Sequence, residues 1–457
     1  MSTSETASYR QTFSEMARLA VPIVLVQVGM MLMGVVDTMV VGRVSALALA
    51  AVAVGNLYSF GVLAFGMGAL MALDPIIAQA VGARDDRAIS RGMQRGILLA
   101  LGLTVPTSLL LLPVAPILRL ARQPEELIPL ASQFAHISIV GVLGFYLFVV
   151  FRQTLQAMGR LAAVVWTIVL ANVLNLGINW ILVFGHLGFP PMGAAGAAWA
   201  TAISRWVMAA AILFFARADL RPRLSPWSDE SLDHRSLWGM FRVGAPIGFQ
   251  YMLEFGVFGV VGLMMGALGT SEVAGHQVAL NLASLTFNVP LGVASAAAVM
   301  VGRAVGAEDA IGARHSATAA LSLAAGFMSS TALLFLTSAW PLARLYTHVD
   351  EVLAVATTLI PLAGVFQVFD GIQVTAIGIL RGLGDTRAPM LVNILGFWLI
   401  GFPTSLLLGF RAGMGPAGLW WGLVAGLAAV AIVLAIRVRV KLGRGARRLQ
   451  YEAPGRR

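Results

Sequence analysis

Long apolar stretches without a charged residue recur along the whole chain. One of them extends from Leu161 to Ser204 and contains no Asp, Glu, Lys or Arg. A membrane-spanning helix needs about 20 predominantly apolar residues, so such stretches are long enough to cross a bilayer. Only 11% of the 457 residues are charged, against roughly a quarter in soluble domains. The sequence therefore excludes a soluble globular domain and indicates a polytopic membrane protein.

Twelve segments are candidates for membrane-spanning helices. They are residues 19–42, 46–79, 96–118, 128–151, 161–184, 194–216, 243–267, 273–302, 316–340, 353–380, 388–410 and 414–436. Only helices and closed barrels satisfy their backbone hydrogen bonds within lipid, and these segments lack the alternation of barrel strands. We therefore predict an all-α polytopic membrane protein with twelve transmembrane helices.

Basic residues are distributed unevenly between the two sides of this topology. The loop with Arg84, Arg87, Arg91 and Arg95 and the tail from Arg437 lie on the basic side. By the positive-inside rule, both termini are expected in the cytoplasm. The net charge of +10 thus reflects membrane orientation, and we expect no nucleic-acid partner. A single Lys beside 30 Arg suggests a GC-rich bacterial source, and hence the bacterial cell inner membrane.

The two halves of the chain resemble each other at a spacing of about 224 residues. The sequence QAVGA at 79–83 corresponds to RAVGA at 303–307, and Pro22 corresponds to Pro246. Two six-helix halves in the same orientation form a parallel repeat, an arrangement typical of transporters. The alternatives for such a duplicated bundle are a channel and a purely structural scaffold, although no loop carries a repeated filter-like motif.

The repeat predicts two lobes joined by one polar segment. The expected divisions are an amino-terminal lobe at 1–217, a cytoplasmic inter-lobe linker at 218–242, a carboxyl-terminal lobe at 243–438 and a basic cytoplasmic tail at 439–457.

Four acidic residues lie within the predicted membrane helices, namely Asp37, Asp74, Glu254 and Asp370. An aspartate at mid-helix costs about 3 kcal/mol on insertion scales, so each is a candidate functional residue. The only basic residue expected inside a helix is Arg205, so buried salt bridges do not account for all four. A proton or Na⁺ would neutralise them. The alternatives are a protonated carboxyl in a helix interface and, for Asp74, a position in the wet headgroup region.

Polar residues of the fifth and sixth helices form a second candidate set. Asn172, Asn175 and Asn179 recur at helical spacing, and their amides can offer oxygens to Na⁺ beside Asp37, together with Thr201. The alternative is that these asparagines hold neighbouring helices together.

A third set is a candidate substrate cleft, lined by large and amphipathic side chains. Its members are Tyr251, Phe255, Phe258, Asn281, Phe287 and Phe366. Such residues can adapt to varied ligands, but they more commonly pack helices. We interpret His276 as structural, since a single histidine makes a poor metal site.

No sequence signature of an enzyme is present. The chain has no cysteine, which excludes a thiolate metal site and a cysteine nucleophile. It also lacks an HExxH motif and a strand-borne phosphate loop. We therefore expect a protein that is not an enzyme, has no cofactor, and draws its energy from an ion gradient or from the gradient of its own ligand.

The chain resembles the multidrug and toxic compound extrusion (MATE) family, and especially its NorM-type branch. The stretches that carry the resemblance are VDTMVVG at 36–42, IAQAVGA at 77–83, GAPIG at 244–248, YMLEF at 251–255, VAGHQVALN at 273–281, PLG at 290–292 and FDGIQVTAIGILRGLGDTRAPM at 369–390. The resemblance implies two lobes of six helices around a V-shaped central cleft. It also implies antiport of an organic cation or other amphiphile against Na⁺ or H⁺.

The resemblance assigns roles to several candidates. Glu254 and Asp370 match the carboxylates that NorM-type proteins use for the coupling cation and substrate, and Asp37 matches the carboxylate of the amino-terminal lobe. Asn175 and Thr201 match further ligands of that amino-terminal cation site. Asn179 departs from the pattern, because some family members have a carboxylate there. Asp74 resembles an acidic position of other MATE branches.

The expected function is secondary active multidrug efflux by alternating access. The partners expected are small cationic or amphiphilic substrates and the lipid bilayer, and the protein is expected to be a monomer. One alternative is a flippase for lipid-linked oligosaccharides from the same superfamily, whose members typically have cationic cavities. The other is a channel, which would conduct ions without coupling them to a second substrate.

Overall fold

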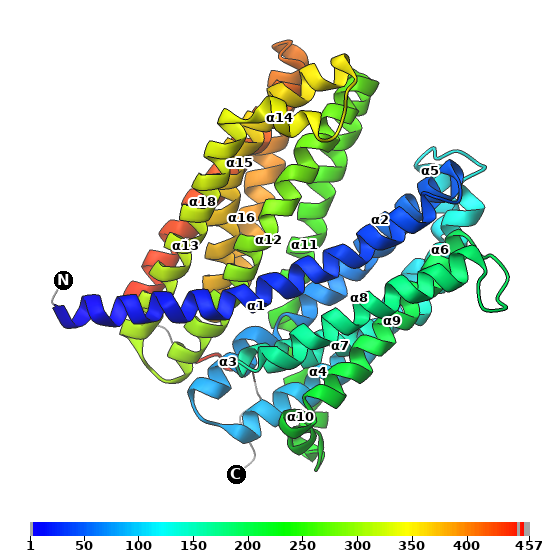
Figure 1. Ribbon diagram of the computed structural model, residues 1–457. Helices are drawn as coiled ribbons and strands as arrows, with labels where there is room; N and C mark the ends of the chain where they lie inside the picture. Colours follow the sequence, from blue (N-terminus) through cyan, green and yellow to red (C-terminus); the bar gives the residue numbers. More distant parts are fainter. Residues whose placement is uncertain (1–2, 446–447, 452–457) are drawn as a thin grey trace. The chain divides into compact units, whose positions relative to one another are not determined.

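The computed structural model describes residues 3–445 and 448–451, and every regular element within them is helical (Figure 1). Eleven helices in this part of the chain are long and apolar enough to cross a membrane, or twelve if one bent pair forms a single span. The prediction of an all-α polytopic membrane protein is therefore confirmed.

The amino-terminal half contains ten α-helices. They are α1 (Thr3–Val41), α2 (Ala46–Leu70), α3 (Leu73–Gly82), α4 (Asp86–Leu111), α5 (Val114–Leu120), α6 (Ile128–Val140), α7 (Val142–Ala157), α8 (Leu161–Phe184), α9 (Ala194–Phe215) and α10 (Arg217–Leu224). Helix α8 packs beside α9, and α2 packs beside α6. The bent pair is α6 and α7, whose axes differ by 50° at Gly141, where the sequence predicted one span.

The carboxyl-terminal half begins with a short 3-10 turn at Asp229–Leu232. The helices that follow are α11 (His234–Leu268), α12 (Thr270–Gly306), α13 (Ala310–Thr337), α14 (Ala339–Arg344), α15 (Asp350–Gly382), α16 (Arg387–Asn393), α17 (Phe402–Leu406) and α18 (Gly415–Gly443). Helices α12, α13 and α15 pack against one another. Two π-helical turns, Ile394–Gly401 and Leu407–Arg411, flank α17.

The chain divides into two compact units. The amino-terminal unit contains Leu25–Val81, Asp85–Gly248 and the tail residues Gln450 and Tyr451. The carboxyl-terminal unit contains Phe249 to Leu449, the part of α1 up to Val24, and Gly82–Arg84. The lobe boundaries expected from the repeat stay a prediction.

Two helices, α1 and α11, contribute residues to both units. In α1 the division follows Val24, and in α11 it follows Gly248. Each position lies two residues after one of the repeat-related prolines, Pro22 and Pro246. Proline has no N–H and interrupts the hydrogen bonding of a helix, so both helices are locally weakened near these divisions.

The segment after α10 is held onto α4 by one buried side chain, that of Gln94. Its Nε2 donates to the backbone oxygens of Arg223 and Pro226, at 2.9 and 3.2 Å. Its Oε1 accepts from the backbone N of Ser228 at 3.0 Å and from the Ser231 hydroxyl at 2.7 Å. The predicted linker is therefore an ordered part of the amino-terminal unit.

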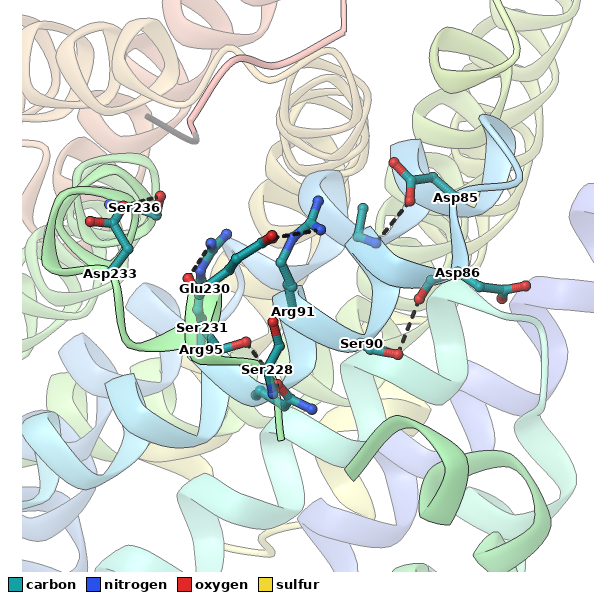
Figure 2. Close-up of polar contacts among 12 residues, drawn as sticks. Asp85, Asp86, Ser90, Arg91, Arg95, Ser228, Glu230, Ser231, Asp233 and Ser236 are labelled. Carbon is teal, nitrogen blue, oxygen red and sulfur yellow. Dashed lines mark hydrogen bonds and ion pairs between the residues drawn. The ribbon is translucent and has the colours of Figure 1, made fainter. Parts of the chain in front are cut away.

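Charged side chains of α4 also contact this segment (Figure 2). Arg91 pairs with the Glu230 carboxylate at 3.0 Å, and Arg95 donates to the Glu230 backbone oxygen at 2.8 Å. Asp233 accepts from the hydroxyl and the backbone N of Ser236, at 2.6 and 3.0 Å. These hydrogen bonds from Ser236 hold the pKa of Asp233 below its usual range, so the start of α11 is capped by an ionised carboxylate.

Replacing Gln94 by leucine is expected to release this segment. The variant loses four hydrogen bonds and leaves their partners unsatisfied, so trypsin should cleave after Arg223 or Arg235 at least about tenfold faster. Limited proteolysis in detergent measures the rate. The control is Ser90→Ala, which removes an exposed hydrogen bond within α4; equal cleavage of the two variants would contradict the attachment.

Glycines form a close seam between the α16–α17 segment and α18. A Cβ on Gly426 would lie 2.8 Å from the Gly396 backbone oxygen and 2.8 Å from the Cα of Gly401, and a Cβ on Gly422 would overlap Ser405. Gly396 and Gly401 are five residues apart, a spacing that rotates far around a regular α-helix. The π-helical turn brings them to one face, because its i→i+5 hydrogen bonds widen the helix.

The seam predicts that Gly422→Ala is severely destabilising. A methyl group there must displace the backbone of Ser405, whereas the matched variant Gly326→Ala in α13 meets no atom within 4 Å. Overpacking of this kind costs about 1–3 kcal/mol or more. Thermal unfolding of the purified variants followed by fluorescence-detected size exclusion measures the difference. Equal melting temperatures would show that the helices are not in close contact.

Candidate ion-binding sites

Asp37, near the end of α1, accepts hydrogen bonds from three side chains of α8 and α9. Asn175 and Asn179 donate from Nδ2 to its Oδ1, at 3.3 and 2.7 Å. Thr201 donates to its Oδ2 at 2.5 Å. The two asparagines are one helical turn apart, so both amides face α1. The structure thus brings together four of the five residues that the sequence grouped, and their role as ion ligands stays a prediction.

The oxygen atoms of this cluster are suited to a small cation. The amide oxygens of Asn175 and Asn179 are buried, and no donor in the described part of the chain reaches them. Rotation of each amide would direct that oxygen toward Asp37 in place of the N–H group. A carboxylate, amide oxygens and a hydroxyl are the ligands that hard cations prefer. Arg205, whose charge interacts with Asp37, limits the positive charge that the site can hold.

Asn172, the third asparagine, does not belong to this cluster. Its Nδ2 donates to the backbone oxygen of Gly29 in α1 and to that of Ile168 in α8, both at 2.9 Å. For Asn172 the structure supports the alternative that the amide holds neighbouring helices together.

The expectation that Arg205 is the only basic residue inside a helix is wrong. Arg95, Arg152 and Arg381 lie within α4, α7 and α15 and are buried. Arg152 donates to Gln27 Oε1 at 3.3 Å. These helices are longer than the uncharged stretches from which they were predicted. The arginines lie in the parts of the helices beyond those stretches, so they were not expected inside a helix.

Asp74 lies in the first turn of α3 and is fully buried. The suggestion that it occupies the wet headgroup region is therefore wrong. The carboxylate lies inside the amino-terminal unit because α3 begins directly after the short break at Met71 and Ala72. A coupling role for Asp74 stays a prediction.

The carboxyl-terminal unit brings Glu254 of α11 and Asp370 of α15 together. The two carboxylates are close enough to repel each other. Gln250 and Gln373 hydrogen-bond to Glu254, whereas no residue in the described part of the chain donates a hydrogen bond to Asp370. Two neighbouring carboxylates with so few donors are a strong site for a proton or a cation.

Sequence analysis missed the amides that surround this pair. Gln250, Gln367, Gln373 and Asn393 are each buried. Gln367 Oε1 accepts from the Thr286 hydroxyl, and Gln373 Nε2 donates to Asn393 Oδ1 at 3.3 Å. The available signal was helical spacing, because residues 367, 370 and 373 recur every three positions on one side of α15.

The candidate cleft residues are divided between packed and more open positions. Phe366 is buried and packs edge to face on Phe258 and Trp420, at ring centroid distances of 6.1 and 5.8 Å. Trp420 Nε1 donates to His276 Nδ1 at 3.2 Å, which agrees with a structural histidine. The remaining members are half-buried, as for Tyr251, Phe255 and Phe287, or exposed, as for Asn281.

The Asp37 cluster predicts the effects of two variants, one on stability and the other on stabilisation by Na⁺. Thr201→Val removes one donor from the buried carboxylate and should lower stability by about 1–3 kcal/mol. Asn179→Asp adds a second carboxylate and should increase the thermal stabilisation that Na⁺ provides over K⁺. Melting curves in the two salts measure both effects. The interpretation is wrong if Na⁺ stabilises Asn179→Asp no more than the parental protein.

Known proteins resemble this chain over nearly its whole length. The MatE family model matches residues 22–181 and 246–407, one segment in each half. A "Multidrug resistance protein NorM" of Burkholderia vietnamiensis is 35% identical over 432 residues, which cover 93% of each chain. A "Multidrug resistance protein MdtK" of Edwardsiella ictaluri is 34% identical and covers 92% of this chain and 94% of the relative.

Solved structures support the fold independently. The crystal structure of a eukaryotic MATE transporter, AtDTX14, superposes with a TM-score of 0.88 at 24% identity, covering 96% of this chain and 99% of that one. The resemblance inferred from the sequence motifs is thereby confirmed: the chain belongs to the MatE family.

Proposed function

We propose that this protein exports organic cations or amphiphilic drugs in exchange for Na⁺ or H⁺ by alternating access. The observation that carries the proposal is the pairing of Glu254 and Asp370, with no hydrogen-bond donor to Asp370 in the described part of the chain. Relatives that are named multidrug resistance proteins support the same function.

Competition for these carboxylates would couple the two fluxes. A cationic substrate and a proton or Na⁺ both compensate the negative charge of Glu254 and Asp370, so binding of one weakens binding of the other. One charge moving across 100 mV yields about 2.3 kcal/mol, which suffices for modest concentrative export. The Asp37 cluster would provide a second, separate position for the coupling ion.

The proposed setting is the bacterial cell inner membrane, with both termini in the cytoplasm and the protein a monomer. No cofactor beyond the coupling ion is required, and no catalytic role is proposed. A flippase for lipid-linked oligosaccharides and a channel are the alternatives. The two neighbouring carboxylates favour cationic substrates over the anionic pyrophosphate of a lipid-linked sugar.

Asp370→Asn and Glu254→Gln are expected to lower ion-driven transport of ethidium about tenfold or more. The expectation follows because each variant removes a charge for which substrate and ion compete. Purified protein in ethidium-loaded liposomes, exposed separately to a Na⁺ and a proton gradient, provides the measurement. The control is Glu125→Gln, which lies in an exposed ion pair with Arg119.

The outcomes separate the candidate functions. Parental rates in both carboxylate variants would refute the competition mechanism. Currents without saturable exchange would indicate a channel, and transport of lipid-linked sugars without ethidium movement would indicate a flippase. Movement under only one gradient would identify the coupling ion.

A further inference from the structure

The amide of Gln373 connects the Glu254 carboxyl to a second amide, that of Asn393. Gln373 hydrogen-bonds to Glu254, and its Nε2 also donates to Asn393 Oδ1 at 3.3 Å. Gln373 is fully buried and Asn393 is 3% exposed. An NH₂ group has two hydrogens, so a single nitrogen can donate to a carboxylate and to an amide oxygen together.

The other ends of both amides have no partner. Gln373 Oε1 and Asn393 Nδ2 are buried, and in the described part of the chain neither forms a hydrogen bond. One is an acceptor and the other a donor. If both amides rotated by half a turn, Asn393 Nδ2 would donate to Gln373 Oε1, and Gln373 Nε2 and Asn393 Oδ1 would take the positions without a partner. The bond between the two amides is therefore kept in both arrangements.

The two amide arrangements suit different forms of the Glu254 carboxyl. The ionised form is only an acceptor and needs the Gln373 NH₂ group, as observed. A protonated carboxyl gains an O–H donor, which Gln373 Oε1 can accept once the amide has rotated. A bound Na⁺ would attract the same oxygen. Rotation of one amide without the other would place two oxygens or two NH₂ groups against each other, so the pair rotates together.

We propose that Gln373 and Asn393 act as a paired amide switch, which positions the Glu254 carboxyl in its ionised form and in its neutralised form. This inference rests on the proposed coupling role of Glu254. Both are positioning residues, because Asn393 acts through Gln373. Asn393 is the last residue of α16 and directly precedes the π-helical turn at Ile394. The hydrogen bonds through Gln373 and Asn393 therefore connect the Glu254 carboxyl to the start of that turn.

Few other charged groups complicate this arrangement. On the helices around Glu254, Asp370 of α15 is the titratable group that interacts with it in the described part of the chain. His276 of α12 is bound to Trp420. Arg381 of α15 lies about three helical turns beyond Asp370, at the carboxyl-terminal end of the helix.

The test measures the ion dependence of ethidium transport in Gln373→Leu, Asn393→Leu and the double variant. A hydrogen bond to an ionised group is stronger than one to a neutral group, so Gln373→Leu should move the half-maximal pH about one unit toward alkaline values. Asn393→Leu should move it less, in the same direction. The double variant should match Gln373→Leu alone. If Na⁺ drives transport, the half-saturating Na⁺ concentration should instead rise up to about tenfold.

A spectroscopic readout tests the contact itself. The carboxyl C=O band of Glu254 in infrared difference spectra is identified by its loss in Glu254→Gln, and it should shift in Asn393→Leu. The matched control is Ser405→Ala, in the same transmembrane segment, which removes a buried hydrogen bond to the Leu419 backbone oxygen. That control should leave both the band and the ion dependence at their parental positions.

The outcomes keep the two proposals apart. Additive shifts in the double variant, or a parental band and ion dependence in Asn393→Leu, would overturn the switch while Glu254→Gln still abolishes coupling. Parental coupling in Glu254→Gln would instead overturn the proposed function. Loss of transport in Asn393→Leu at every pH, with a parental band, would show that Asn393 has only a structural role.

Discussion

A polar group within a membrane helix has no water to bind, so it must find its partners inside the protein. This constraint explains the contacts that organise both units. Asp37 is surrounded by donors from two other helices, and Gln94 satisfies four groups of the segment that it holds. Among the acidic groups considered for ion binding, Asp370 departs from it, because in the described residues it has no donor. A buried carboxylate without hydrogen-bond donors is the group that gains most from binding a proton or a cation.

The internal repeat duplicated the helical scaffold but not these groups. At the spacing of 224 residues that relates Pro22 to Pro246, Asp37 corresponds to Val261. Val261 is buried, so the position that carries a carboxylate in one half carries a packed apolar side chain in the other. The two halves thus share a helical scaffold but carry chemically different polar groups.

The sequence predicted the fold well because hydropathy alone specifies where a chain can cross lipid. The segment predicted at 161–184 has the bounds of α8. The Asp37 cluster was also predictable, since its asparagines lie at helical spacing. The amides linked to Glu254 were not, because Gln373 and Asn393 are 20 residues apart and become neighbours only in the folded chain. Buried arginines such as Arg152 were missed because helix ends extend beyond the apolar stretches.

The π-helical turn at Ile394–Gly401 also has a consequence for how this segment tolerates changes in length. A π-helical turn holds one residue more than the corresponding α-helical turn. Removing one residue between Gly396 and Gly401 would leave a four-residue spacing, which a regular α-helix places on one face. The glycines could then still meet Gly426, so the segment should accept a deletion that would break the register of any neighbouring helix.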